Sequence, residues 1–383
     1  MTTGGFGVPK GAILFELDGI QYEVRENLGG DERGISRFVA RQRIGEQTKE
    51  KVLLSAVGGS SSLPITKLLR ARAKLEEQVR LAKYLEHPGV HRVHGLKKTE
   101  GTWYVITEYP RGNTLSTLIN LVGECRHWYT PQFTMYVGAR VADVLEHAHA
   151  AKDEQGRPLN IVHRSIDPDH VYLEWNGMIR VSDFGLSLSN LPGRIPSTVR
   201  RLNGDGFYSS PEMILGKRVD ARADLFSLGM ILLELSTGKN LLDAPDELTA
   251  EVKASLSAPK LRRVKRSIER ARLSKGSRLL EDAIWRAATY TEADVERATD
   301  KLPEGLRMTL HKLLHPALSK RYQTAGELGV DLRHWLREMA FSPDDAIREV
   351  TRVMNEAGNH MANTGLDSAL PKRRAKSFRA VTR

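Results

Sequence analysis

The chain has 383 residues, of which 40% are hydrophobic and 27% are charged, and such proportions are typical of a globular protein. The single cysteine excludes an internal disulfide, and the first residues lack the basic and apolar parts of a secretory signal. The longest apolar run, residues 225–235, is too short to cross a bilayer. We therefore expect a cytoplasmic protein without a transmembrane segment.

The formal net charge of +11 is concentrated in two segments. Residues 260–278 hold nine basic residues and one acid, and residues 371–383 hold six basic residues and no acid. Because these segments carry more than the whole net charge, the rest of the chain is slightly acidic. Such segments are usually solvated surface or tails, but they also fit an acidic partner, an anionic lipid or a nucleic acid.

The first part of the chain is predicted to form a small, strand-rich lobe over residues 21–109, after an arm at residues 1–20. Alternating apolar and polar residues predict strands at residues 22–30, 36–44, 51–57, 91–98 and 102–109. A helix begins at Ile65 and ends before Pro88, because proline cannot continue a helix.

The second part is predicted to form a larger, helical lobe over residues 110–340, with a charged helical insertion at about residues 239–303. Apolar residues at helical spacing predict helices at residues 131–149, 222–237, 304–317 and 324–340. The helical lobe is thus expected to contain the longer part of the chain.

Residues 341–383 are predicted to form a C-terminal helix followed by a basic tail. Ser342 is the expected N-cap of this helix, and Gly358 is its expected end. We expect the helix to dock on the large lobe through an apolar stripe, which consists of Ile347, Val350 and Met354.

Several motifs occur in a fixed order along the chain. They are Thr107-Glu108-Tyr109, His163-Arg164, Asp183-Phe184-Gly185, Ser210-Pro211-Glu212, Asp224 and Arg321. In this order they resemble the Ser/Thr protein kinases of the bacterial, eukaryotic-like (Hanks) type, over about residues 20–340. The resemblance implies an α+β fold with two lobes, a small β-rich N-lobe and a larger helical C-lobe.

The resemblance also implies roles for the best-preserved residues. Asp183 is similar to the aspartate that binds a metal ion, and Asp224 is similar to the aspartate that braces the catalytic loop. Glu212 and Arg321 are similar to a glutamate and an arginine that form a buried ion pair. In the family, these residues hold the large lobe together, so we expect the fold to be intact.

Four positions depart from the family pattern. Ser55 stands where the family has the lysine that holds the phosphates, and Gln78 stands where it has the partner glutamate of that lysine. Ser165 replaces the catalytic aspartate, and His170 replaces a metal-binding asparagine. If the alignment with the family pattern is shifted by one residue, Glu77 occupies the position of the partner glutamate. Serine is not a competent general base at neutral pH, so Ser165 removes the usual proton acceptor.

The positions that surround a nucleotide are altered as well. In the glycine-rich loop, between Gly29 and Gly34, Asp31 replaces a glycine and adds both a Cβ and a negative charge. Leu53 and Tyr172 are larger than the residues that the family places above and below adenine. The remaining positions of the expected pocket are Thr107 as gatekeeper, with Glu108 and Tyr109 as the hinge.

Arg164 suggests a regulatory remnant. In the family this arginine often holds a phosphate on the activation segment, and here that segment offers Ser187, Ser189, Ser197 and Thr198 beside Arg194, Arg200 and Arg201. The alternative is that Arg164 only forms hydrogen bonds with loop carbonyls.

These observations favour a pseudokinase that requires no cofactor and acts as a regulatory or scaffolding module in bacterial signalling. Its partner would be a protein, such as an active kinase or another signalling or assembly protein. One alternative is an atypical ATP- and magnesium-dependent Ser/Thr kinase or other transferase, in which Lys49 or Lys51 and the substitute base Asp167 act around Asp183. For His170 beside Asp183 two interpretations stay open, namely coordination of a transition metal and hydrogen bonding within a loop that no longer binds magnesium. The last alternative is a nucleic-acid or anionic-surface binder that uses the basic segments.

Overall fold

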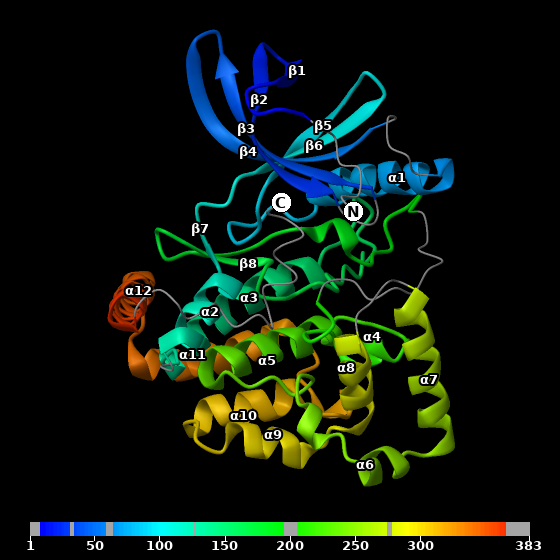
Figure 1. Cartoon of the computed structure of the whole chain (residues 1–383), viewed down its shortest axis with the longest axis vertical. Coiled ribbons are helices and arrows are strands. Elements are labelled where there is room, and N and C mark those ends of the chain that lie inside the picture. The colour runs from blue at the N-terminus through cyan, green and yellow to red at the C-terminus, as the bar shows by residue number, and fades with distance from the viewer. Residues whose placement is uncertain are drawn as a thin grey trace. The chain divides into compact units, whose positions relative to one another are not determined.

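The computed structural model describes residues 8–30, 34–58, 64–125, 128–194, 205–273 and 278–364. Two compact units divide these residues. The small unit contains the described residues up to Glu86 together with His91–Arg111, and the large unit contains His87–Val90 and Gly112–Met361. Figure 1 shows that strands dominate the first unit and helices the second.

An antiparallel sheet of six strands forms the small unit, with the order β1-β2-β3-β4-β6-β5. The strands are β1 (Ile13–Leu17), β2 (Ile20–Gly30), β3 (Ser36–Ile44), β4 (Gln47–Val57), β5 (Val93–Thr99) and β6 (Thr102–Glu108). Helix α1 (Ile65–Ala82) packs on this sheet through Ala71 and Leu75, which contact Val57 and Val105. Alternate residues of the strands form a second apolar cluster around Phe38 and Leu54.

Strand β1 lies in the segment that the sequence assigns to an N-terminal arm. It pairs with β2, and Phe15 stacks on Tyr22 and packs at a tilt against Tyr104, with ring centroids 4.5 and 4.7 Å apart. Part of the arm is therefore an integral edge of the sheet. An edge strand of five residues has too short a pattern to stand out in the sequence.

The large unit is built around α5 (Arg222–Thr237), in which every residue from Ala223 to Ser236 is buried. A helix that is apolar on all sides packs in the middle of a domain, and α5 contacts α3, α9 and α10. The other α-helices are α2 (Leu115–Cys125), α3 (Pro131–His149), α4 (Pro211–Ile214), α6 (Ala250–Ala254), α7 (Ala258–Leu273), α8 (Arg278–Thr289), α9 (Glu292–Thr299), α10 (Glu304–Leu313), α11 (Ala325–Met339) and α12 (Pro343–Thr364).

A three-stranded sheet carries the loops of the candidate site. Its strands are β7 (Gly112–Thr114), β8 (Val171–Glu174) and β9 (Ile179–Val181), in that order. The segment before β8 contains His163 and Ser165, and the segment after β9 contains Asp183. Pairing of β8 with β9 thus brings these two segments together.

The C-terminal helix α12 differs from the sequence prediction in two respects. It continues past Gly358 to Thr364, and its buried face consists of Ala346, Glu349, Val350, Val353 and Ala357. Of the predicted stripe, Val350 is buried, whereas Met354 is 42% exposed. Glu349 fixes the docking, since its carboxylate accepts hydrogen bonds from the amide and the hydroxyl of Thr130 at 2.7 and 2.6 Å.

Among the described residues, no helix is both long enough and apolar enough to cross a membrane.

Candidate catalytic and nucleotide-binding site

Asp224 at the start of α5 organises the loop that carries the expected catalytic residues. Its carboxylate is fully buried and accepts hydrogen bonds from the amides of His163 and Arg164, both at 2.8 Å. The Nε2 atom of His149 on α3 lies 2.9 Å from the same carboxylate. Arg164 has a positive φ of 66°, which these contacts hold in place. Asp224 therefore fixes the backbone of this loop at His163 and Arg164.

His163 is buried and links the catalytic loop to the segment after β9. Its Nδ1 accepts a hydrogen bond from the Ser165 amide at 3.2 Å, so Nε2 carries the ring proton and donates to the Ser182 carbonyl at 2.9 Å. Burial lowers the pKa of His163, and the nearby Asp224 only partly offsets this effect. A neutral imidazole with both nitrogens occupied has a structural role here.

Ser165 is the residue that stands where the resemblance implies a catalytic base. Its side chain is 4% exposed, and its hydroxyl has no hydrogen-bond partner among the residues that the structure describes. No imidazole or carboxylate among those residues is hydrogen-bonded to this hydroxyl to take its proton. The geometry thus provides no activation of Ser165.

Asp167 was the candidate for a substitute base, and its carboxylate is fully engaged. Oδ1 lies 2.7 Å from His170 Nδ1 and accepts the Asp169 amide at 3.0 Å, and Oδ2 faces the Asp205 amide at 3.4 Å. Burial alone would raise the pKa of Asp167, but His170 and these amides outweigh it and lower the pKa. A carboxylate held in its ionised form by fixed donors is a weak proton acceptor.

His170 lies between two carboxylates. Its Nδ1 donates to Asp167, and its Nε2 lies 3.8 Å from Oδ2 of Asp183. Each ring nitrogen therefore faces a different carboxylate, Nδ1 that of Asp167 and Nε2 that of Asp183. Sequence reasoning placed His170 beside Asp183, but it did not foresee that Asp167 would orient the ring.

Asp183 retains a clear structural role. Its Oδ1 accepts the Gly185 amide at 3.3 Å and caps the short turn Phe184–Leu186, and its own φ is 60°. Phe184 is buried against the His163 ring, with centroids 4.5 Å apart in an edge-to-face arrangement. These contacts fix the backbone of the DFG motif.

The residues around Asp183 do not fit the pair of magnesium ions that the resemblance implies. Magnesium prefers oxygen ligands, and an imidazole stands where the family has an amide oxygen. Within the described ranges, no group of three or more His, Cys, Asp or Glu side chains is placed to hold a metal ion.

The small unit presents Ser55 on one face of β4. Ser55 and Leu53 are half-buried, while Val52, Leu54 and Ala56 point into the core on the other face. Leu53 pairs with Thr107 on β6, whose hydroxyl donates to the Leu53 carbonyl at 3.1 Å. Sheet register thus places Ser55 and Leu53 on the same side as the gatekeeper residue.

Two lysines were candidates to replace the missing cation. Lys51 lies on the exposed part of β4, with its ammonium group 5.5 Å from the centre of the Tyr109 ring, and Lys49 is also exposed. Glu108 ends β6 and accepts a hydrogen bond from the Arg92 amide at 3.1 Å, and Tyr109 follows the strand. The contact with Tyr109 positions Lys51 at the hinge segment.

On α1, Glu77 rather than Gln78 is the more buried residue. Glu77 is 6% exposed and forms an ion pair with Lys74 at 2.8 Å, whereas Gln78 is half-buried. The charge of the Glu77 carboxylate is therefore balanced by Lys74 of the same helix. Burial and the ion pair thus distinguish Glu77 from Gln78, which sequence spacing alone could not do.

The glycine-rich loop is described at its two ends. Gly29 and Gly34 have φ values of 87° and 85°, which are left-handed conformations that favour glycine. Asp31 lies outside the described residues. Tyr172 is half-buried on β8 of the large unit, opposite Thr114 of β7.

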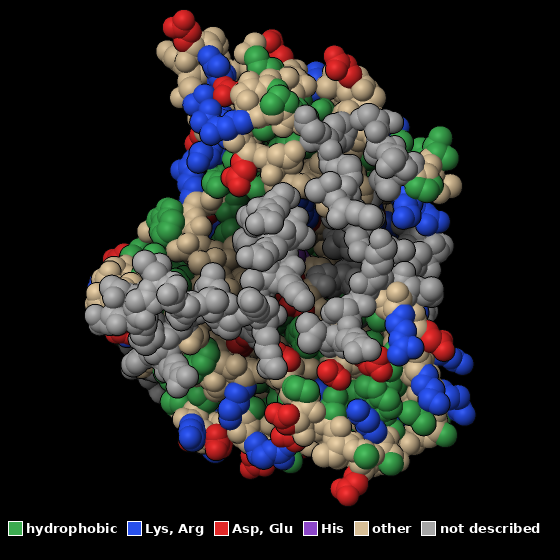
Figure 2. Space-filling model, viewed as in Figure 1, with side chains coloured by type: hydrophobic (Ala, Val, Ile, Leu, Met, Phe, Trp, Pro, Cys, Tyr) green, Lys and Arg blue, Asp and Glu red, His purple; other side chains and the backbone are tan. Residues whose placement is uncertain are grey.

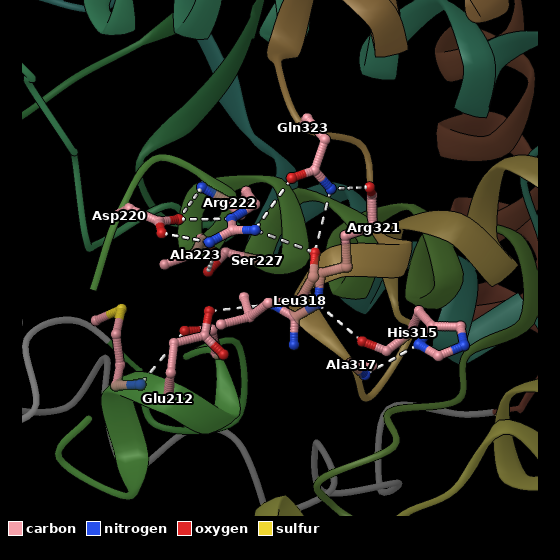
Figure 3. A network of polar contacts seen from close by, with 12 residues as sticks. Glu212, Asp220, Arg222, Ala223, Ser227, His315, Ala317, Leu318, Arg321 and Gln323 are labelled. Carbon is pink, nitrogen blue, oxygen red and sulfur yellow. Dashed lines mark hydrogen bonds and ion pairs between the residues drawn. The ribbon is translucent and has the colours of Figure 1, made fainter. Parts of the chain in front are cut away.

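Glu212 and Arg321 form the buried ion pair that the resemblance implies (Figure 3). Arg321 Nη1 lies 3.0 Å from Glu212 Oε1, and the two side chains are 0% and 4% exposed. Arg321 also donates from Nε to the His315 carbonyl at 2.8 Å. A second contact, which sequence reasoning missed, joins the buried Glu234 of α5 to the hydroxyl of Tyr208. The segment around Glu212 is thus fixed to α5 and to the loop before α11.

The described part of the activation segment limits the phosphorylation hypothesis. Ser187 and Ser189 are 2% and 8% exposed, and Arg194 donates to both of their carbonyls, at 3.1 and 3.0 Å. Burial makes these two serines less accessible to another kinase than an exposed hydroxyl would be. The remaining candidates, Ser197, Thr198, Arg200 and Arg201, lie outside the described residues.

Comparisons with known proteins place these motifs in one family. The family model described as "Protein kinase domain" matches residues 56–328, which is more than half of the chain. The chain belongs to the protein kinase family. It has the β-sheet N-lobe and the helical C-lobe of the two-lobed α+β kinase fold.

Curated kinases share part of this sequence. The tyrosine-protein kinase MasK of Myxococcus xanthus is 37% identical over 162 residues, which are 42% of this chain and 25% of MasK. The serine/threonine-protein kinase PrkC of Bacillus subtilis is 27% identical over 180 residues, which are 47% of this chain and 26% of PrkC. The chain thus matches about a quarter of the length of each relative. These matches support membership of the Hanks-type family.

Proposed function

We propose that this chain is a catalytically inactive member of the kinase family, a pseudokinase that uses the kinase fold as a regulatory or scaffolding module for a protein partner. The observation that carries this proposal is the state of the catalytic loop. Ser165 replaces the base and is buried, and the neighbouring Asp167 is held ionised by His170 and two amides. Neither side chain is suited to accept a proton from a substrate hydroxyl.

The loss of the base is expected to have a large effect on rate. A positioned general base contributes about 10²–10⁴-fold to catalysis. Ser55 also lacks the positive charge that stabilises the transferred phosphoryl group, and His170 replaces an oxygen ligand of the metal. Because these losses affect separate requirements of the reaction, one substitution elsewhere would not restore it.

The scaffold residues support a retained binding function. Asp224, Glu212 and Arg321 keep buried contacts that fix the large unit, although the chemistry around Asp183 has changed. Partner recognition needs a folded surface but no proton acceptor. An active kinase or another signalling or assembly protein is the class of partner that we propose.

Phosphorylation and nucleotide binding measured on the same preparations test the proposal. The purified chain is incubated with labelled ATP, with magnesium or manganese, and with Ser/Thr and Tyr substrates, beside an Asp183→Ala control. We expect no phosphate incorporation above that control. A second variant, with Ser55→Lys, Ser165→Asp and His170→Asn, tests whether these three residues cause the inactivity, and a gain of activity in it would support this explanation.

Nucleotide binding gives the second part of the experiment. If the nucleotide positions are lost as proposed, ATP with either metal leaves the thermal unfolding temperature unchanged. An increase that Asp183→Ala abolishes, together with phosphate transfer by the wild type, would instead establish an atypical active transferase.

A further inference from the structure

Helix α7 carries a basic surface that the kinase motifs do not use. Its inward face is formed by Val264, Ser267 and Ile268, all of which are buried. Lysines and arginines dominate the outward face, at Lys260, Arg262, Arg263, Lys265 and Arg266, which are all exposed. Because the inner residues are packed, the helix is held with this basic face toward the outside.

Two further arginines of α7 have structural partners. Arg270 donates to the Ser267 hydroxyl at 2.6 Å, and its guanidinium packs so closely over Gly216 that a Cβ there would lie 2.5 Å from Nη1. Arg272 pairs with Glu281 of α8 at 3.2 Å. These contacts fix the C-terminal half of α7 against the segment after α4 and against α8.

The outward cations have no such partners. The side chains of Lys260, Arg262, Arg263, Lys265 and Arg266 form no ion pair with any residue that the structure describes. Glu269 is the one acid between residues 260 and 273. In Figure 2, Lys and Arg side chains, with a few acidic ones, stand at the edge of the molecule where α7 lies.

Lys217, just after α4, extends this basic surface. Partial desolvation lowers the pKa of Lys217, and the positive charges of Arg263 and Lys260 lower it further, although the carboxylate of Glu212 acts in the opposite direction. Cations of two separate segments therefore lie close enough to repel one another. Repulsion of this kind is relieved when an anionic group binds between the cations.

We infer that the outward face of α7, together with Lys217, is a docking surface for an acidic segment of a partner protein. The choice of a protein segment rests on the charge of the surroundings. Outside its two basic segments the chain is slightly acidic, so a long polyanion would meet repulsion beyond α7, whereas a short acidic segment contacts the cations alone. This inference builds on the proposed function and names the chemistry of the partner.

Fluorescence anisotropy with an oligoglutamate peptide tests the docking surface. The full chain is compared with a variant that reverses four charges of α7, namely Arg262→Glu, Arg263→Glu, Lys265→Glu and Arg266→Glu. A matched control reverses four exposed charges on other elements, namely Lys49→Glu, Lys67→Glu, Arg70→Glu and Lys301→Glu. The double variant Arg262→Glu/Arg266→Glu replaces the quadruple variant if the latter does not fold by circular dichroism.

We expect the wild type to bind the peptide with an affinity that falls steeply with salt. The α7 variant should bind at least about tenfold more weakly, and the control should change by less than about twofold. Absence of peptide binding to the wild type, or equal loss in both variants, would overturn the inference. Single- or double-stranded DNA of equal charge that binds more tightly through the same α7 residues would assign the surface to nucleic acid and also overturn it.

The result can be separated from the fate of the proposed function. Peptide binding is measured without nucleotide and does not depend on Ser165 or Asp183. Phosphate transfer by the wild type would refute the inactive pseudokinase and leave the α7 result standing. Loss of α7 binding would refute the docking surface and leave the inactivity standing.

Discussion

Removal of one partner of the Glu212–Arg321 ion pair should destabilise the large unit more than removal of both. The two side chains are almost fully buried, and the His315 carbonyl and the face of the Phe226 ring, 4.7 Å away, give further support to the charge of Arg321. Glu212→Gln keeps the shape of the side chain but leaves this charge without a counter-ion. Breaking a buried pair in this way costs about 3–5 kcal/mol.

The double variant Glu212→Leu/Arg321→Met removes both charges together. Replacement of a buried ion pair by apolar residues of similar size is often neutral, so the double variant should be more stable than Glu212→Gln by at least about 2 kcal/mol. Glu281→Gln is the matched control, because its partner Arg272 is 70% exposed. We expect that change to cost less than about 1 kcal/mol.

Urea unfolding followed by tryptophan fluorescence measures these differences. Four of the five tryptophans lie in the large unit, at residues 128, 175, 285 and 335. The signal therefore reports mainly the unit that contains the ion pair. The reasoning fails if Glu212→Gln costs no more than the exposed control, or if the double variant is less stable than the single one.

Three further predictions concern the site and α12. Asp224→Asn should cost about 2–4 kcal/mol in urea unfolding, because an amide cannot accept both backbone hydrogen bonds with the strength of a carboxylate. Asp167 has a lowered pKa, so its contribution to stability is complete above its ordinary pKa of about 3.9 and is lost as the pH falls through the folded value. The difference in melting temperature between the wild type and Asp167→Asn should therefore shrink below about pH 4. Val353→Ala should cost about 1–2 kcal/mol because Val353 is fully buried, whereas the exposed Met354→Ala should be nearly neutral by the same measurement.

The sequence predicted the fold well where one element carries several independent signals. Helix α5 has the predicted bounds, because a long apolar run lies between Asp224 and the left-handed Gly238. The prediction for α12 was less accurate. Gly358 costs a helix only about 1 kcal/mol relative to alanine, and the buried Ala357 beside it helps to hold the helix on the large unit.

The candidate site shows what sequence alone could not predict. The identities of Ser165 and His170 can be read from the sequence, but the lowered pKa of Asp167 depends on the orientation of the His170 ring and on the amide of Asp205, which is 38 residues away. Motif spacing placed the partner of the missing lysine at Gln78, and only side-chain burial identified the Lys74–Glu77 pair. Charge patterning located the basic segment, whereas its outward face follows from the packing of Val264 and Ile268.

The central claim is that the catalytic loop around Ser165 no longer supports phosphoryl transfer. The most direct test is incorporation of labelled phosphate by the wild type relative to Asp183→Ala, with magnesium or manganese at saturating ATP. We predict equal background incorporation by the two proteins. Incorporation by the wild type that Asp183→Ala abolishes would contradict the claim and show that another group accepts the proton.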